Sequence, residues 1–154
     1  MPEELYSVIE DWRNGRPFFE FKTSGSTGSP KALKISREKI LLSARKTISF
    51  LNLKPGITAL LALKMDYIAC FMVLIRTLES GMDLHYFPPV SDPFEKLNSH
   101  RKYFAALVPL QVHALLEKNY DLRNFHSIII GGAALNIKLR EKVKHLEYPV
   151  YETY

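Results

Sequence analysis

Residues 57–87 read ITALLALKMDYIACFMVLIRTLESGMDLHYF, and this stretch decides the fold. Its first seven residues, 57–63, are all apolar or β-branched, as in a short, fully buried strand. Apolar residues then recur at helical spacing through residues 68–78, and Gly81 can end that helix. Residues 84–87 form a second candidate strand, which two prolines close. A strand, a helix and a strand in this order predict a crossover between two parallel strands.

The same alternation continues toward the C-terminus. Further strands are expected at residues 104–108, 127–130 and 150–153, and helices at 110–118 and 137–146. This pattern predicts an α/β fold whose mostly parallel sheet carries helices on both faces. Ligands of such sheets gather beyond the carboxyl ends of the strands, so residues 24–31, 64–67 and 131–135 are candidate site loops.

Polar residues mark several expected helix starts. Ser36 can cap a helix that Pro55 and Gly56 terminate, and an earlier amphipathic helix is expected at residues 2–14. Asp66 fits a cap of the helix at 68–78, although it could also serve as an acid. Asp92 precedes a proline and has a glutamate three residues later, which predicts one more helix start.

Two alternating segments near the N-terminus, 18–23 and 32–36, predict an antiparallel strand pair around a loop. The loop, with its flanks, reads TSGSTGSPK at residues 23–31. Its glycines allow backbone N–H groups to converge on an anion, and its hydroxyls and the Lys31 ammonium add donors for phosphate oxygens. The composition fits a polyphosphate cradle, but it also fits a plain flexible turn. It is not a P-loop of the Walker type, because Pro30 replaces the second glycine and Ala32 follows the lysine.

Composition excludes several classes of protein. The 154 residues are 47% hydrophobic and 24% charged, as in an ordinary globular domain. The net charge of the chain is +5, but the basic residues are scattered along the sequence. This distribution favours a solvated surface over a nucleic-acid interface. The uncharged apolar segments are too short for a membrane span. A single cysteine, Cys70, fits a cytoplasmic setting, and the five histidines show no zinc-type spacing, so no metal site is expected from protein ligands.

The nine residues at 23–31, placed between two strands, closely resemble the phosphate-binding loop of the adenylate-forming superfamily. That family includes acyl-CoA synthetases, luciferases and peptide-synthetase adenylation domains. Residues 130–135, IGGAAL, resemble the family's Gly-Gly turn after a central strand, and residues 150–154, VYETY, resemble the segment that continues Gly-x-Thr-Glu. Val108, Pro109 and Gln111 are similar to a strand-to-helix step of these enzymes.

The resemblance implies a set of site residues. Contacts to the β- and γ-phosphates are expected from the loop, with Lys31 as the catalytic residue, and a pocket and a nucleotide edge are expected further along the chain. The phosphate loop supplies Thr23, Ser24, Gly25, Ser26, Thr27, Gly28 and Lys31. The pocket is shaped by Gly131, Gly132 and Ala133, and the nucleotide edge by Tyr151, Glu152 and Tyr154. A plain turn at 131–133 and core packing of the tyrosines are the alternatives.

The resemblance also implies the reaction. The whole enzyme would use ATP and Mg²⁺ to convert a small carboxylic acid to an acyl-adenylate. The CoA thiol would then displace AMP from the acyl group. The short segment before the loop, with Tyr67, Ile68 and Ala69, is similar to compact O-succinylbenzoate–CoA ligases of menaquinone biosynthesis. The sequence departs from the family pattern in two places: Ala32 follows the motif lysine, and residues 64–67, KMDY, occupy the region after the central strand where the family frequently has a histidine.

Residues 1–154 are therefore expected to be part of an N-terminal AMP-binding domain, with the C-terminal part absent and the fragment alone inactive. The alternative is a nucleotide- or anion-binding module without catalysis. Neither a nucleic acid nor a membrane is expected as a partner.

Overall fold

The computed structural model describes residues 2–22 and 32–153 of the chain. The phosphate loop and Tyr154 lie outside these described residues. The helices are α1 (Glu3–Arg13), α2 (Arg37–Leu51), α3 (Ile68–Ser80), α4 (Pro109–Glu117) and α5 (Ile137–Lys144), with a 3-10 turn at Leu122–Asn124. The strands are β1 (Phe18–Lys22), β2 (Ala32–Ser36), β3 (Ile57–Leu61), β4 (Asp83–Tyr86), β5 (Lys102–Leu107), β6 (Phe125–Ile130) and β7 (Val150–Glu152).

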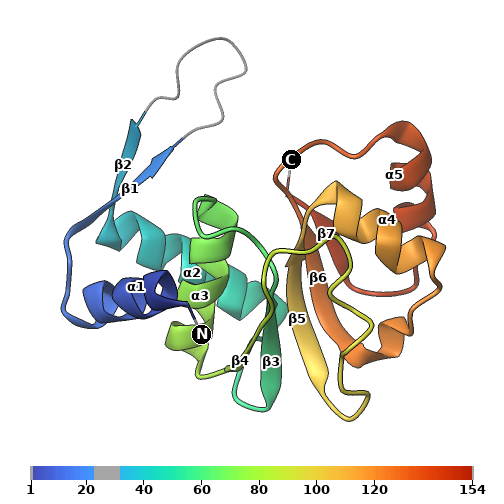
Figure 1. Cartoon of the computed structure of the whole chain (residues 1–154), viewed down its shortest axis with the longest axis horizontal. Helices are drawn as coiled ribbons and strands as arrows, with labels where there is room; N and C mark the ends of the chain where they lie inside the picture. The colour runs from blue at the N-terminus through green and yellow to red at the C-terminus, as the bar shows by residue number, and fades with distance from the viewer. Residues whose placement is uncertain (1, 23–31, 154) are drawn as a thin grey trace.

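Five strands form one sheet in the order β4-β3-β5-β6-β7, and every neighbouring pair in it is parallel. Helices α1 to α3 lie on one side of this sheet and α4 and α5 on the other (Figure 1). The predicted α/β class, with helices on both faces of a parallel sheet, is confirmed. The chain leaves β3 toward β4 and then returns to β5 on the opposite side of β3. The strand order therefore reverses between β3 and β5, which is where such sheets bind ligands.

Alternate residues of the strands pack into two separate hydrophobic cores, one on each face of the sheet. From β3, Ala59 and Leu61 pack with Val73 and Leu74 of α3, whereas Leu60 faces the side of α4. All of these side chains are at most 1% exposed. Burial of one leucine or valine is worth about 1.5–3 kcal/mol, so each face of the sheet firmly fixes its covering helices.

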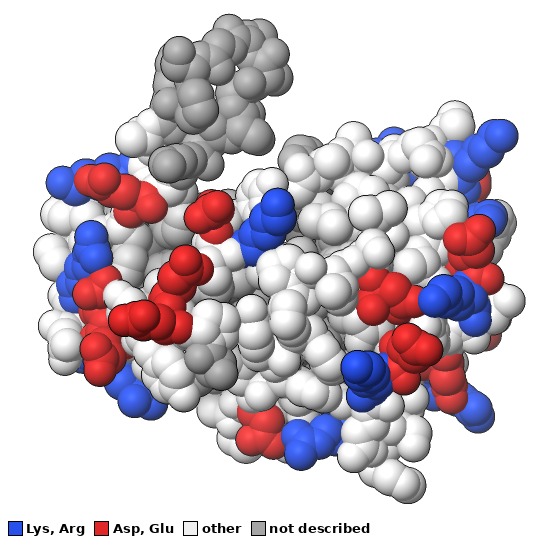
Figure 2. Space-filling view, viewed as in Figure 1, with Lys and Arg blue, Asp and Glu red and all other residues white. Residues whose placement is uncertain are grey.

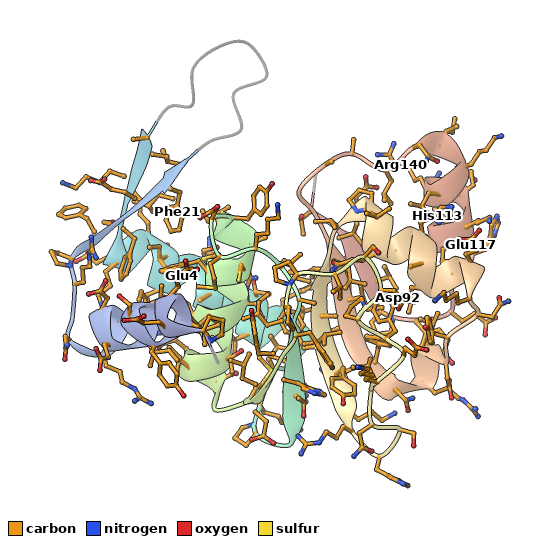
Figure 3. All side chains as sticks on the ribbon, viewed as in Figure 1. Glu4, Phe21, Asp92, His113, Glu117 and Arg140 are labelled. Carbon is orange, nitrogen blue, oxygen red and sulfur yellow. The ribbon has the colours of Figure 1, made fainter. Side chains whose placement is uncertain are left out.

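The predicted antiparallel pair is also confirmed. Strand β1 pairs with β2 from Phe18 opposite Ser36 to Lys22 opposite Ala32. The pair stands away from the main sheet, next to the α1–α3 side (Figure 1). Its base is held by Phe71 of α3, whose ring centroid lies 4.9 Å from that of Phe19 and 5.0 Å from that of Phe21. Figure 3 shows Phe21 on this strand pair, close to α3.

The predicted helix caps at Ser36 and Gly81 are confirmed, and the cap predicted at Asp66 is wrong. The Ser36 hydroxyl accepts a hydrogen bond from the Lys39 N–H at 3.4 Å, and Gly81 ends α3 with a φ of 71°. Asp66 does not cap α3, because the cap position is Tyr67 and no side chain bonds there. Asp66 lies inside a turn that is closed by a hydrogen bond from the Tyr67 N–H to the Lys64 carbonyl oxygen, 3.2 Å away.

The helix expected after Asp92 does not form, because tertiary contacts compete for the aspartate. Its carboxylate accepts hydrogen bonds from the Phe94 N–H at 3.1 Å, the Tyr120 hydroxyl at 3.0 Å and the Lys118 ammonium at 2.7 Å. These contacts fasten the connection between β4 and β5 to the end of α4 (Figure 3). Several strand ends also differ from those expected: β3 ends at Leu61, and β7 ends at Glu152.

Figure 2 shows acidic side chains gathered over the α1 side, whereas charges of both signs are interspersed over the α4–α5 side. A largely uncharged surface lies between the two sides in this view. Among the helices that the structure describes, none is both long and apolar enough to cross a bilayer.

Candidate functional site

A cavity of about 300 Å³ lies where the strand order reverses. Its walls come from the carboxyl ends of β3, β5 and β6, from the start of α3 and from the residue after β7. The residues that line it are Leu63, Ile68, Ala69, Met72, Arg76, Ala106, Leu107, Val108, Ile129, Gly131, Gly132 and Thr153. Most of this lining is hydrocarbon, so the cavity suits the apolar body of an organic ligand.

Among the described residues that line this cavity, Arg76 is the one with a charged side chain. Ile68, Met72 and Arg76 lie at intervals of four along α3, which places them on one face of the helix. Arg76 is only 9% exposed, and within residues 2–22 and 32–153 its Nε has no hydrogen-bond partner. Burial lowers the pKa of the guanidinium to about 10, so it stays charged at neutral pH. The cavity therefore contains a buried cation whose Nε has no partner among the described residues.

The Gly131–Gly132 turn forms the wall opposite α3. Gly131 donates its N–H to the Leu107 carbonyl oxygen at 3.0 Å, and an added Cβ there would lie 2.8 Å from Thr153 Oγ1. Gly132 has a φ of 83°, a conformation that favours glycine. The two glycines thus keep the turn close to the strand ends. Ala133, the third residue expected in the pocket, is exposed and does not line the cavity.

The residues of β7 face opposite sides of the sheet. The Tyr151 ring packs edge-on against Phe50 of α2, with ring centroids 5.2 Å apart. Glu152 lies on the other side, where its carboxylate accepts hydrogen bonds from Arg140 of α5 at 2.6 and 3.0 Å. This pairing holds the pKa of Glu152 below its usual value. Neither side chain lines the cavity, and the nucleotide contacts expected of them stay predictions.

The phosphate-loop residues expected to bind nucleotide, including Lys31, lie outside the described residues. The two strands that flank the loop are described, and aromatic contacts join them to α3. Helix α3 thus contacts the strand pair through Phe71 and the cavity through Met72 and Arg76.

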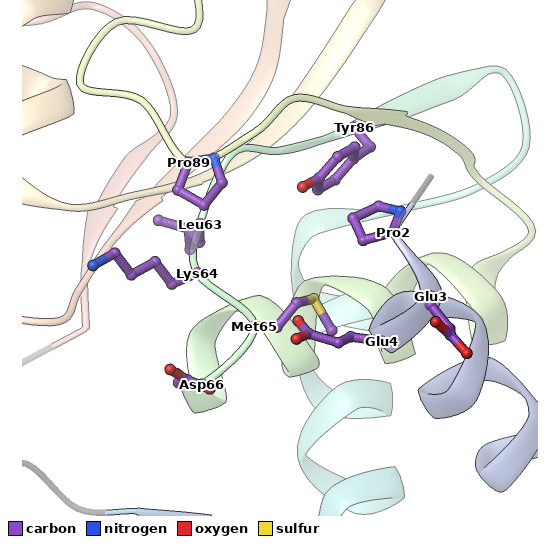
Figure 4. Close-up of a pocket in the computed structure, with 9 residues that line it drawn as sticks. All are labelled: Pro2, Glu3, Glu4, Leu63, Lys64, Met65, Asp66, Tyr86 and Pro89. Carbon is purple, nitrogen blue, oxygen red and sulfur yellow. The ribbon is translucent and has the colours of Figure 1, made fainter.

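A second, open cavity of about 450 Å³ lies beside the start of α1 (Figure 4). Leu63 lines both cavities. Glu3, Glu4 and Asp66 contribute carboxylates to the second cavity, and Figure 4 shows Lys64 extending away from the two glutamates. No group of three or more His, Cys, Asp or Glu side chains in the described part of the chain could hold a metal ion.

Sequence reasoning missed Arg76 as a site residue. Its signal was a single arginine in the otherwise apolar run IACFMVLIRTL, on the same helical face as Ile68 and Met72. A charged residue on the buried face of a helix is rare unless it is paired or functional.

Residues 12–154 match the family model "AMP-binding enzyme". The chain belongs to this family of adenylate-forming enzymes. Its relatives include the 2-succinylbenzoate–CoA ligase of Bacillus subtilis, which is 31% identical over 135 residues. The D-alanine–D-alanyl carrier protein ligase of Lacticaseibacillus casei is 30% identical over 149 residues. Each match covers 86% of this chain but only 28% of the relative.

Solved structures support the same family. An acyl-CoA synthetase (AMP-forming)/AMP-acid ligase II-like protein from Dyadobacter fermentans superimposes with a TM-score of 0.84 at 34% identity. It covers 98% of this chain and 44% of its own. The o-succinylbenzoate CoA synthetase of Bacillus subtilis, solved with ATP and magnesium ion, has a TM-score of 0.65 at 22% identity, which shows a shared fold. That match covers 86% of this chain and 29% of the synthetase. The chain thus spans less than a third of the length of the curated relatives it matches.

Proposed function

We propose that residues 1–154 are part of the N-terminal AMP-binding domain of an acid–CoA ligase whose substrate is a dicarboxylic acid of the 2-succinylbenzoate type. One carboxylate would attack the α-phosphorus of ATP, giving an acyl-adenylate and releasing pyrophosphate. The CoA thiol would then attack the acyl carbon and release AMP. We place this reaction in the cytoplasm, with no nucleic acid or membrane as partner.

The observation that carries the substrate class is Arg76. A buried guanidinium without a partner is costly, and a carboxylate that accepts two parallel N–H bonds offsets that cost. A monoacid whose carboxylate lies at the phosphates would leave this cation unpaired. A substrate with a second carboxylate would pair with it, and its apolar body would fill the remainder of the cavity. The same charge would repel an amino-acid ammonium, which argues against an alanine-type substrate.

The phosphates would be held by the loop residues between β1 and β2. Thr23, Ser24, Gly25, Ser26, Thr27 and Gly28 supply N–H and O–H donors, and Lys31 supplies a cation for the charge that develops on the phosphate oxygens. Mg²⁺ would enter bound to ATP. Gly131 and Gly132 line the acid cavity. Nucleotide contacts beside the cavity are proposed for Ala133, Tyr151, Glu152 and Tyr154.

The test compares acids in the full-length protein. Wild type and Arg76→Met are assayed for pyrophosphate release with 2-succinylbenzoate, 4-oxo-4-phenylbutanoate and 2-butanoylbenzoate. Each of the last two acids lacks one carboxylate. Truncating one partner of a buried charge pair costs about 2–5 kcal/mol, so kcat/KM for the dicarboxylate should fall at least about 30-fold.

The monoacid that retains the activated carboxylate should lose little in the same variant. Equal losses on the dicarboxylate and that monoacid would rule out the proposed role of Arg76. Lys31→Ala is a separate arm, expected to slow pyrophosphate release with every acid. An unchanged rate there would remove the role assigned to the loop.

A further inference from the structure

The side chain of Gln111 connects three segments of the chain at the place where the strand order reverses. Its Nε2 donates to the Ala62 carbonyl oxygen at 3.1 Å and to the Val90 carbonyl oxygen at 2.9 Å. Its Oε1 accepts from the Val108 N–H at 3.2 Å. Ala62 follows β3, Val90 follows β4, and Val108 follows β5. One amide therefore bonds to the exits of three neighbouring strands.

These bonds match the chemistry of a primary amide. Strands lose their ladder partners where they diverge, and backbone groups that become buried there need other partners. Gln111 is 2% exposed, so water is a poor substitute for its bonds. A glutamine side chain supplies two N–H donors and one acceptor oxygen, which is what two carbonyls and one N–H require.

The bonded groups adjoin the walls of the acid cavity. Leu63, the residue after Ala62, lines the cavity, and so does Val108 itself. Gln111 does not line it, since α4 lies on the other side of the sheet from α3 and Arg76 (Figure 1). Any effect of the amide on a bound acid must pass through the backbone of the strand exits.

We infer that Gln111 is a positioning residue, which sets the distance between the Leu63 and Val108 walls and thereby the fit of the acid opposite Arg76. This inference rests on the proposed function. It adds a residue that governs acid binding without touching the acid. The competing explanation is a buried amide that stabilises the fold and nothing more.

Gln111→Glu in the full-length protein separates the two explanations. A protonated glutamic acid keeps one O–H donor and an acceptor in the same shape. The ionised form has no donor and places a negative charge against two carbonyl oxygens. Burial raises the pKa of such a glutamic acid, so the side chain should ionise at a pH above the usual range for glutamic acid. We expect the KM for the acid, relative to wild type at each pH, to rise about tenfold through this transition, while the KM for ATP stays near wild type.

Leu115→Ala is the matched control. Leu115 lies one turn further along α4 and is as buried as Gln111, but it does not bond to the strand exits. It should lower the unfolding temperature and leave the ratio of the two KM values unchanged. The inference is overturned if Gln111→Glu keeps the wild-type ratio at every pH at which it is folded. It is equally overturned if Leu115→Ala raises the ratio as much.

Hydrogen exchange gives a readout that needs no turnover. In Gln111→Met, which supplies no amide oxygen as acceptor for the Val108 N–H, exchange at that N–H should be faster than in wild type, and it should stay slow in Leu115→Ala. Equal protection in both variants would overturn the inference. Wild type that activates no carboxylic acid would instead refute the proposed function.

Discussion

Arg76 lies among hydrocarbon side chains, and the cost of burying its charge bears directly on stability. The folded-state pKa, about 10, lies below that of an exposed guanidinium because of burial. Folding therefore disfavours the charged form at neutral pH, and this penalty is relieved as pH rises through about 10. An unpaired buried cation is a poor contributor to stability but a strong selector of ligands.

Arg76→Met should therefore make the ligand-free protein more stable, by about 1–3 kcal/mol in the free energy of unfolding at pH 7. The gain should shrink above pH 10, where the wild-type guanidinium begins to lose its proton in the folded state. Urea unfolding at pH 7 and pH 10.5 measures both values. Arg76→Lys, which keeps a charge, serves as control, and a destabilised Arg76→Met at pH 7 would contradict the argument.

Gly131 and Thr153 form a second residue-scale test. Gly131→Ala would place a methyl group 2.8 Å from Thr153 Oγ1, which donates to the Ile130 carbonyl oxygen at 2.9 Å. Crowding of this kind costs about 1–3 kcal/mol. In a Thr153→Ala background the cost should fall by half or more, as a double-mutant cycle of urea unfolding would show. Additive effects of the two substitutions would exclude the predicted clash.

At the scale of elements, the connection between β4 and β5 depends on Asp92 rather than on a helix. Desolvation raises the pKa of this carboxyl, but hydrogen bonds from Lys118, the Phe94 N–H and Tyr120 outweigh it, and the net pKa is lowered. A lowered folded-state pKa means that the ionised carboxylate stabilises the fold above its unfolded pKa of 3.8. That stabilisation is lost as pH falls through the folded-state pKa of Asp92.

Asp92→Asn should thus reduce the free energy of unfolding at pH 7 by about 1 kcal/mol. The difference from wild type should shrink as pH falls below 3.8, because the wild-type carboxyl is then increasingly protonated in both states. Denaturant unfolding at pH 7 and at a series of pH values below 3.8 measures it. Asp121→Asn is a useful comparison, because that exposed carboxylate bonds only to Arg123, two residues away, among the described residues. A pH-independent loss in Asp92→Asn would refute the electrostatic explanation.

The sequence predicted the elements whose causes are local. Ser36 caps a helix and Gly81 ends one by their own geometry, and the apolar run from residue 57 could only be a buried strand or helix. Asp92 carried the same local signal as a helix cap, but Tyr120 and Lys118, distant in the sequence, recruited its carboxylate. The order of β4, β3 and β5 and the cavity between their exits depend on long-range contacts, so the role of Arg76 became visible only in the fold.

At the scale of the whole molecule, the two candidate sites lie on different substructures. The loop expected to hold phosphate belongs to the β1–β2 pair, and the acid cavity belongs to the five-stranded sheet. Among the described residues, α3 contacts both the β1–β2 pair and the acid cavity. The chain spans 28% of its curated relatives, so a complete catalytic site is proposed for the longer protein.

Residues 1–154 produced alone should therefore form no acyl-adenylate. The measurement is ATP–pyrophosphate exchange with 2-succinylbenzoate, using the full-length protein as the positive control and circular dichroism to check that the fragment is folded. Exchange above background by a folded fragment would contradict the expected dependence on further residues.

Trp12 gives the molecule a built-in optical label. It is the only tryptophan of the chain, and its indole donates to Glu79 at 2.9 Å while the Arg37 guanidinium lies 3.8 Å from its ring centroid. Phe19 of β1 packs against the same ring. Indole emission responds to nearby charge and packing, so any shift of the strand pair on nucleotide addition should change the fluorescence of this one residue. Ligand titrations can then be followed without attaching a dye.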